Sequence, residues 1–226
     1  MRCSGATPGT SCAARWGPPI GTLETRDLSQ FDAWSLLNGS LTLTSELAYQ
    51  GRWAARAANG GGDIQYQRVW YETDWRVGDN IWYGMALFIP RIEDWCWWAP
   101  IRWDNWRARL GPKADVGGVV IEGGQIYAAY GDYRGQETLI GPVPAPAGRS
   151  FWLEVHQRFS RRARGARTEL YMDGVRVGRS RAANTTARHI DRVRFGNVAM
   201  SSSCSSLSAI YFDRVSYSGS RLGPQP

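Results

Sequence analysis

Short runs of alternating apolar and polar residues, separated by turn-forming residues, dominate this chain from Leu23 onward. Successive side chains of a β-strand point to opposite faces, so such alternation predicts strands with one buried face. In 63–72 the alternation places Ile64, Tyr66, Arg68 and Trp70 on one face. The strands expected from these runs are 41–44, 63–72, 81–89, 119–122, 125–130, 151–159, 168–172, 175–177, 192–200 and 209–217.

Turn signals and the absence of any long amphipathic helix in the sequence favour a single all-β domain. Asp173-Gly174, a dipeptide preferred in tight hairpins, separates 168–172 from 175–177. Prolines at 142, 144 and 146 predict an extended connector that cannot lie in the interior of a sheet. We expect an extended arm over 1–22, one sandwich or barrel domain over 23–220, and a tail over 221–226.

The stretch 94–106 holds five of the 12 tryptophans, with Arg102 and Asp104 set among them. Indole rings usually fill a core, but unpaired charge among them would be costly to bury. We therefore expect part of this stretch to line a groove in which flat rings stack on sugars. The residues predicted to bind a glycan are Trp97, Trp98, Arg102, Trp103, Trp106 and Arg158.

The net charge of +7 favours anionic partners, and Lys113 is the only lysine, so the positive charge is almost entirely arginine. Arginine makes planar, two-pronged contacts with carboxylate, sulfate and phosphate. A base-composition bias in the gene would explain the arginines equally well. The basic run 161–167 is interpreted as a solvent-facing loop between two strands that can touch phosphate or sulfate. No nucleic-acid-binding module is visible, and no window of 18 apolar residues predicts a membrane span.

An even number of cysteines predicts two disulfides, for which three pairings exist. We prefer Cys3–Cys12, which closes a short loop containing Gly and Pro, together with Cys96–Cys204. Disulfides imply an oxidising compartment, hence an extracellular or surface-displayed protein. Because 1–21 contains no apolar signal core, we expect either a leader that this sequence lacks or another export route.

Several blocks resemble the concanavalin A-like lectin/glucanase jelly rolls of bacterial carbohydrate-active proteins. They are LETRDLSQFDAW at 23–34, YQGRWAAR at 49–56, WLEVH at 152–156, ELYMDGVRV at 169–177 and IYFDRV at 210–215. The segment from WYG at 82–84 to FIP at 88–90 is similar to heparin-lyase-like polysaccharide lyases. The resemblance implies a jelly-roll sandwich of two antiparallel sheets.

The same resemblance implies a structural calcium ion held by Glu24 and Asp213. Calcium takes six to eight oxygen ligands, so backbone carbonyls would have to complete the shell. The alternative is that Glu24 pairs with an arginine and that Asp213 accepts backbone N–H bonds. No organic cofactor is expected.

A lyase needs a base beside a uronate carboxylate and groups that neutralise this carboxylate. The resemblance implies His156 and Tyr171 for proton transfer and Arg68 (or Gln67) for neutralisation. Such lyases lead us to expect Gln-x-His on the strand after Pro90, but the nearest match here is Arg102-Trp103-Asp104, so the catalytic set is incomplete. The glucanase pattern Glu-x-Asp-x-x-Glu begins at Glu72 but lacks its third acid, which disfavours retaining hydrolysis.

The sequence therefore favours an extracellular jelly roll that binds an acidic polysaccharide through a concave face lined by Trp and Arg. Two other classes stay open. One is a polysaccharide lyase that cleaves a uronic-acid glycan by β-elimination. The other is a structural or adhesion subunit of a capsid or surface appendage, which could self-associate through its tryptophans, since Trp and Arg are enriched at protein interfaces.

Overall fold

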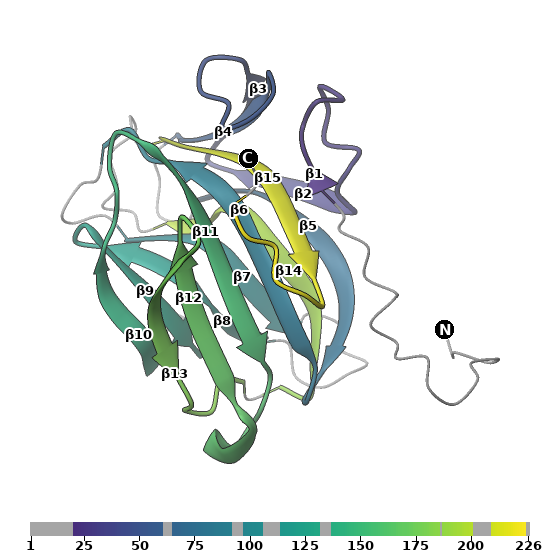
Figure 1. The fold of residues 1–226 in the computed structure, drawn as a ribbon. Coiled ribbons are helices and arrows are strands. Elements are labelled where there is room, and N and C mark those ends of the chain that lie inside the picture. Colours follow the sequence, from purple (N-terminus) through teal and green to yellow (C-terminus); the bar gives the residue numbers. More distant parts are fainter. Residues whose placement is uncertain are drawn as a thin grey trace.

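The computed structural model describes residues 20–60, 65–91, 97–105, 114–131, 137–185, 187–200 and 209–224. These residues form two antiparallel β-sheets packed face to face as a sandwich (Figure 1). The predicted all-β, two-sheet jelly-roll architecture is confirmed. No helix in the described ranges is both long and apolar enough to cross a membrane. The expected arm over 1–22 lies almost wholly outside the described residues.

One sheet has eight strands in the order β13-β12-β11-β6-β15-β4-β3, with β1 also paired to β15. Its members are β1 (Ile20–Gly21), β3 (Gly39–Thr44), β4 (Ala54–Asn59), β6 (Asn80–Phe88), β11 (Ser150–Arg158), β12 (Arg167–Met172), β13 (Val175–Ser180) and β15 (Ala209–Ser218).

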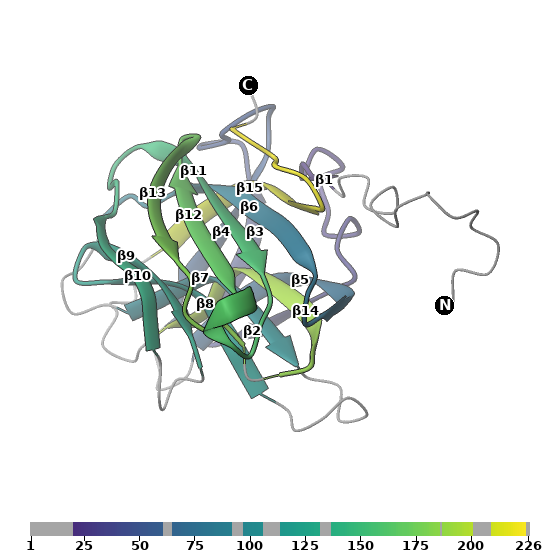
Figure 2. The ribbon, with the colours of Figure 1, turned by 60° about the horizontal axis from the view of Figure 1, so that its bottom comes forward.

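The other sheet has seven strands in the order β10-β9-β8-β7-β14-β5-β2. Its members are β2 (Ala33–Leu37), β5 (Gln65–Arg76), β7 (Trp97–Asn105), β8 (Ala114–Glu122), β9 (Gln125–Tyr130), β10 (Glu137–Pro144) and β14 (His189–Met200). Figure 2 shows β13 of the first sheet beside β9 and β10 of the second, and β10 and β13 are in contact.

A continuous apolar core lies between the sheets. Trp75 stacks between Tyr83 and Phe159, with ring centroids 6.0 and 5.9 Å away. Tyr83 also packs on the ring of Trp103, at 5.5 Å. These large side chains come from both sheets, so the alternation of each strand sends its apolar positions into one shared interior.

Every expected strand overlaps an observed one, whereas β1, β2, β4, β7 and β10 were not predicted. The expected connector at the Pro142–Pro146 region is partly a strand, because β10 runs to Pro144. Since β10 is an edge strand of its sheet, prolines there remove no ladder hydrogen bond from a sheet interior.

The hairpin predicted at Asp173-Gly174 joins β12 to β13, and both turn residues have positive φ, 49° and 78°. Positive φ at both central positions is what a type I′ turn requires. The loop between β11 and β12 contains the short 3₁₀ helix Ala163–Gly165.

Candidate functional site

Charged side chains occupy the outer face of the seven-stranded sheet, which we define as the face turned away from the eight-stranded sheet. In β5 the residues Val69 and Tyr71 point into the core, so the alternate residues Arg68, Trp70 and Glu72 point outward. The same alternation applies to β14 and β7, which are the neighbours of β5 along the sheet.

Strand pairing brings these outward residues into two adjacent rows. In one row, Trp70 of β5 lies opposite Arg194 of β14, which lies opposite Arg102 of β7. In the next row, Arg192 of β14 lies opposite Glu72 on one side and opposite Asp104 on the other. We call Arg102, Asp104, Arg192 and Arg194 the Asp104 cluster.

The cluster is held by an ion pair between Asp104 and Arg194. Arg194 reaches both carboxylate oxygens, through Nη2 to Oδ1 and through Nε to Oδ2, which is the forked geometry of strong guanidinium–carboxylate pairs. Asp104 is 0%, Arg102 2% and Arg194 3% exposed. Buried charges are tolerated only when they are paired and hydrogen-bonded, so this face carries an ionic layer sheltered from water.

Gly118 of β8 makes room for Arg102. A Cβ atom at this position would lie 2.4 Å from the carbonyl oxygen of Ile101 and 3.0 Å from Cγ of Arg102. Because Gly118 lies directly opposite Arg102 in the ladder, the missing side chain leaves the space that the arginine stem occupies.

Partly exposed aromatic rings and arginine side chains, Arg192 of the cluster among them, lie at the margin of the buried ion pair. The Arg192 guanidinium lies 4.8 Å above the Trp70 ring, and burial lowers the pKa of Arg192 more than the nearby Asp104 raises it. Arg68 lies 3.9 Å above the Tyr66 ring and donates to Ser35 Oγ and to the carbonyl of Val198. Aromatic rings and guanidinium groups thus alternate along the outer face of β5.

The structure separates the tryptophans that we predicted to line one groove. Trp98 and Trp103 are 2% and 0% exposed and belong to the core, so the prediction that their rings face a groove is wrong. The reason is alternation, because Trp103 is flanked in β7 by the outward residues Arg102 and Asp104. Trp97 is half-buried and lies opposite Glu122. Trp106 lies outside the described residues, as do Cys3, Cys12, Cys96 and Cys204.

His156 and Tyr171 lie on the eight-stranded sheet, on the outer face opposite to Arg68, so the three residues assigned to lyase catalysis are not brought together. The His156 ring stacks on Trp82 at 4.0 Å with an interplanar angle of 3°. Its Nδ1 lies 2.7 Å from Glu169 Oε2, to which the Tyr171 hydroxyl also donates. We call Trp82, His156, Glu169 and Tyr171 the His156 cluster.

The C-terminal segment covers this cluster. The Arg221 guanidinium lies 4.6 Å above the Tyr171 ring and 5.9 Å above the Trp82 ring. The backbone N–H groups of Leu222 and Gly223 both donate to Oε1 of the buried Glu154. Stacking, burial and coverage together suit a structural role better than contact with a substrate. Arg158, predicted to bind glycan beside Arg102, also lies on this sheet.

The two residues expected to hold calcium meet at the loop that follows β3. Glu24 Oε1 accepts the backbone N–H groups of Arg52 and Trp53, and Asp213 Oδ2 accepts that of Gln50. Burial raises the pKa of Asp213 to about 7, against its bonds from Gln50 and Arg214, and the charge of Glu24 adds to the rise. The two carboxylates thus bond neighbouring residues of the same loop.

The donor set at this site fits a hard cation. Gln50 Oε1 is buried there without a hydrogen-bond partner. Gly51 has φ +80°, and a Cβ on it would lie 2.4 Å from Glu24 Oε1, so glycine lets the loop wrap around the carboxylate. No group of three or more His, Cys, Asp or Glu side chains in the described ranges could hold a metal. Amide, carbonyl or water oxygens would therefore have to complete a calcium shell.

The sequence reasoning missed Arg192 and Arg194. A signal was present, because the predicted strand 192–200 has apolar Val193 and Phe195 at alternate positions, which sends both arginines to the opposite face. What the sequence did not contain was the partner strand, since β14 pairs with β5 and β7, more than eighty residues away in the chain.

Several solved structures share this two-sheet architecture. The endo-β-1,4-glucuronan lyase of the fungus Trichoderma reesei has a TM-score of 0.71 and 14% identity, covering 89% of this chain and 94% of that chain. The cellulose-induced protein Cip1 has a TM-score of 0.65 and 14% identity, covering 91% and 99%. An alginate lyase in complex with an alginate trisaccharide has a TM-score of 0.51 and 13% identity, covering 74% and 82%.

At these identities the likeness establishes the fold that we expected from the resemblance, and nothing of the chemistry. No family model matches the chain, and no curated protein matches it.

The His156 cluster predicts a pH dependence of stability. Burial lowers the pKa of His156 below its usual 6.5, outweighing the opposite effect of Glu169. Burial would raise the pKa of Glu169, but its bond from His156 and the charge of Arg167 outweigh burial and lower it. At these two groups the unfolded chain therefore takes up protons before the folded one does, so their contribution to the free energy of unfolding should fall as pH drops below about 6.5. Asp213, whose pKa is raised to about 7, contributes in the opposite direction over this pH range.

Urea unfolding at pH 7 and pH 5.5 measures this dependence. His156→Gln removes the histidine contribution and leaves that of Asp213, so this variant should lose less stability than wild type on acidification, or gain more. His189→Gln is the control for the loss of a histidine outside the cluster. An equal change in stability in wild type and His156→Gln, or a larger loss in the variant, would show that the direction assigned to His156 is wrong.

Proposed function

We propose that this chain binds an anionic polysaccharide across the outer face of the seven-stranded sheet. The observation that carries the proposal is the register that aligns Trp70, Arg194 and Arg102 in one row and Arg192 in the next. With Arg68, this surface carries four arginines against the two carboxylates Asp104 and Glu72.

The half-buried side chains would make the direct contacts. A sugar ring stacks its C–H face on an aromatic ring, a role for Trp70 or Tyr66, and guanidinium groups take up carboxylates. Arg192 and Arg68 each lie over one of these rings, so a ring face and a cation are offered side by side. Arg102 and Arg194 are buried, so they would act through the positive field beneath the ligand.

The structural neighbours support this choice of ligand. One acts on glucuronan and another was solved with an alginate trisaccharide, both of which are carboxylate-bearing polysaccharides. An extracellular or surface-displayed setting, with the four cysteines paired as two disulfides, belongs to the same proposal.

Cleavage of such a polymer by β-elimination is the second candidate function. The arginines could neutralise the uronate carboxylate, as elimination requires. Elimination also requires a base, and Asp104 is poorly suited to that role among the described residues. Its ion pair with Arg194 favours the charged carboxylate, which therefore accepts a proton less readily. On the seven-stranded sheet the structure places one histidine among its described residues, His189 at the start of β14. Its Nδ1 lies 3.7 Å from Asp74 Oδ1. We favour binding because none of the described residues is placed as a base beside these arginines.

We also propose that Glu24, Gln50 and Asp213 hold a structural calcium ion. Its charge would offset the repulsion between the two carboxylates. The ion would also bind Gln50 Oε1, which has no hydrogen-bond partner among the described residues. The ion would tie the loop after β3 to β15, far from the Asp104 cluster, so its role is stability.

Binding to the outer face is tested by titrating polyglucuronate and alginate into the wild-type protein and into Arg192→Gln. Loss of one charge-assisted contact should weaken binding about tenfold, and wild-type affinity should fall as salt rises. Arg161→Gln, which removes one exposed arginine charge on the loop after β11, is the control for loss of a single positive charge and should bind as wild type.

Ultraviolet absorbance of the unsaturated product distinguishes the classes in the same samples. If the absorbance rises steadily in wild type and in His156→Gln but not in Asp104→Asn, the function is cleavage by β-elimination and not binding alone. No retention of either polymer, together with ordered self-association, would point to the structural class.

The calcium proposal predicts a higher melting temperature in about 10 mM CaCl₂ than in EDTA. For a site with a dissociation constant of about 0.1–1 mM the rise should be about 3–10 °C. Asp213→Asn should abolish the rise, whereas Glu46→Gln, an exposed acid beside the same loop, should keep it. An identical melting temperature in EDTA, CaCl₂ and MgCl₂ would rule the ion out.

A further inference from the structure

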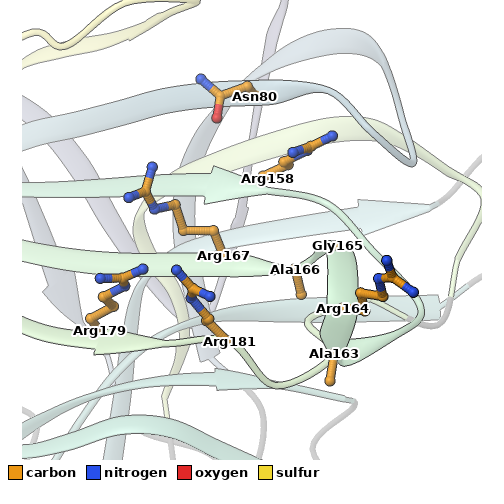
Figure 3. A pocket seen from close by; sticks show the side chains of 9 residues that line it. All are labelled: Asn80, Arg158, Ala163, Arg164, Gly165, Ala166, Arg167, Arg179 and Arg181. Atoms are coloured by element: carbon orange, nitrogen blue, oxygen red, sulfur yellow. The ribbon is translucent and has the colours of Figure 1, made fainter.

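A second positively charged site lies at one end of the eight-stranded sheet. A pocket of about 400 Å³ opens there between β6, β11, β12 and the loop before β12. Figure 3 shows five arginines around it, from two neighbouring strands, from the 3₁₀ helix and from the β13 segment. They are Arg158, Arg164, Arg167, Arg179 and Arg181, and we call this site the five-arginine pocket.

Among the described residues that line the pocket, none is a carboxylate that could balance these charges. Glu169, just outside it, lies 3.4 Å from Arg167 and 3.9 Å from Arg179. The same carboxylate also contacts Arg176 and His156, so its charge is shared among several partners. No described acidic residue pairs with Arg158, Arg164 or Arg181, so the pocket holds a large positive excess.

Strand pairing forces two of these charges together. Arg158 of β11 lies directly opposite Arg167 of β12, and both side chains point away from the core. Like charges opposite one another in a ladder destabilise a sheet. An anion held between the two guanidinium groups would turn this repulsion into two favourable contacts.

The lining also indicates which anion fits. Apart from arginine it offers Asn80 and the small residues Ala163, Gly165 and Ala166, and no aromatic ring on which a sugar could stack. Recognition must therefore depend on charge, and several guanidinium groups converging on one space favour a multiply charged oxyanion over a single carboxylate. The volume is at the lower end of the range for small-ligand sites and exceeds what one bare oxyanion needs.

We propose that the five-arginine pocket binds a doubly charged tetrahedral oxyanion, carried as a phosphate monoester on a small molecule. The pocket lies on the eight-stranded sheet, whereas the Asp104 cluster lies on the seven-stranded sheet. The proposal is therefore independent of polysaccharide binding at that cluster.

Isothermal titration calorimetry at constant ionic strength tests the proposal, with inorganic sulfate, inorganic phosphate and glucose 6-phosphate as probes and chloride as reference. Wild type should bind the oxyanions saturably at one site, and tighter binding of glucose 6-phosphate would indicate that the ester is the natural form. Arg158→Gln combined with Arg167→Gln should weaken binding by about tenfold or more.

Arg161→Gln combined with Arg162→Gln is the matched control, because both side chains are exposed on the same loop and neither lines the pocket. This control should bind within about twofold of wild type, a difference well below the contribution of one charged contact. Equal losses of affinity in the two double variants would mean that only general charge attraction is at work, and would overturn the proposal. Binding heats that do not saturate, or that chloride gives as well, would overturn it too.

Melting curves at low salt check folding independently. The Arg158/Arg167 double variant should melt close to the wild-type temperature, because it relieves a repulsion but also loses the contact of Arg167 with Glu169. Added sulfate should raise the melting temperature of wild type only. If that double variant proves unfolded, Arg181→Gln at the rim replaces it in the titration, and unchanged affinity in this variant would contradict the proposal.

Discussion

The ion pair between Asp104 and Arg194 is the interaction on which the charged surface depends. Both side chains are almost completely buried on the outer face of a sheet, where an unpaired charge would cost several kcal/mol. Arg194 contacts both carboxylate oxygens of Asp104, and the strand register places Arg194 between Arg102 and Trp70. Three arginines can therefore lie on neighbouring strands of one face, and Arg192, at the margin, is left partly exposed over an indole ring.

The two sheets use their outer faces differently. On the eight-stranded sheet, stacking of His156 on Trp82 and coverage by the C-terminal segment close the middle of the face. At one end of the same face the five-arginine pocket opens. On the seven-stranded sheet, paired charges form a buried layer with rings and cations above it. The shared core between the sheets allows these outer surfaces to differ without affecting the packing that holds them together.

Alternation along single strands was readable from the sequence, and it predicted the sandwich, the hairpin at Asp173-Gly174 and the shared face of Tyr66, Arg68 and Trp70. The tryptophan-rich stretch was misread because residues adjacent in the chain were taken as adjacent on one surface. A strand sends neighbours to opposite faces, so Trp103 enters the core while Arg102 and Asp104 point outward. The assignment of His156 and Arg68 to one site failed for a different reason, since which sheet a strand joins depends on pairings distant in the chain.

A double-mutant cycle on Asp104 and Arg194 tests the central claim most directly, with the free energy of unfolding in urea as the measured quantity. Asp104→Leu and Arg194→Met should each destabilise the protein by about 3–5 kcal/mol, because each leaves a buried charge unpaired. The double variant should be far more stable than the sum of the two losses predicts. Small and additive losses would contradict the account, since they would mean that the two charges neither depend on each other nor organise this face of the sheet.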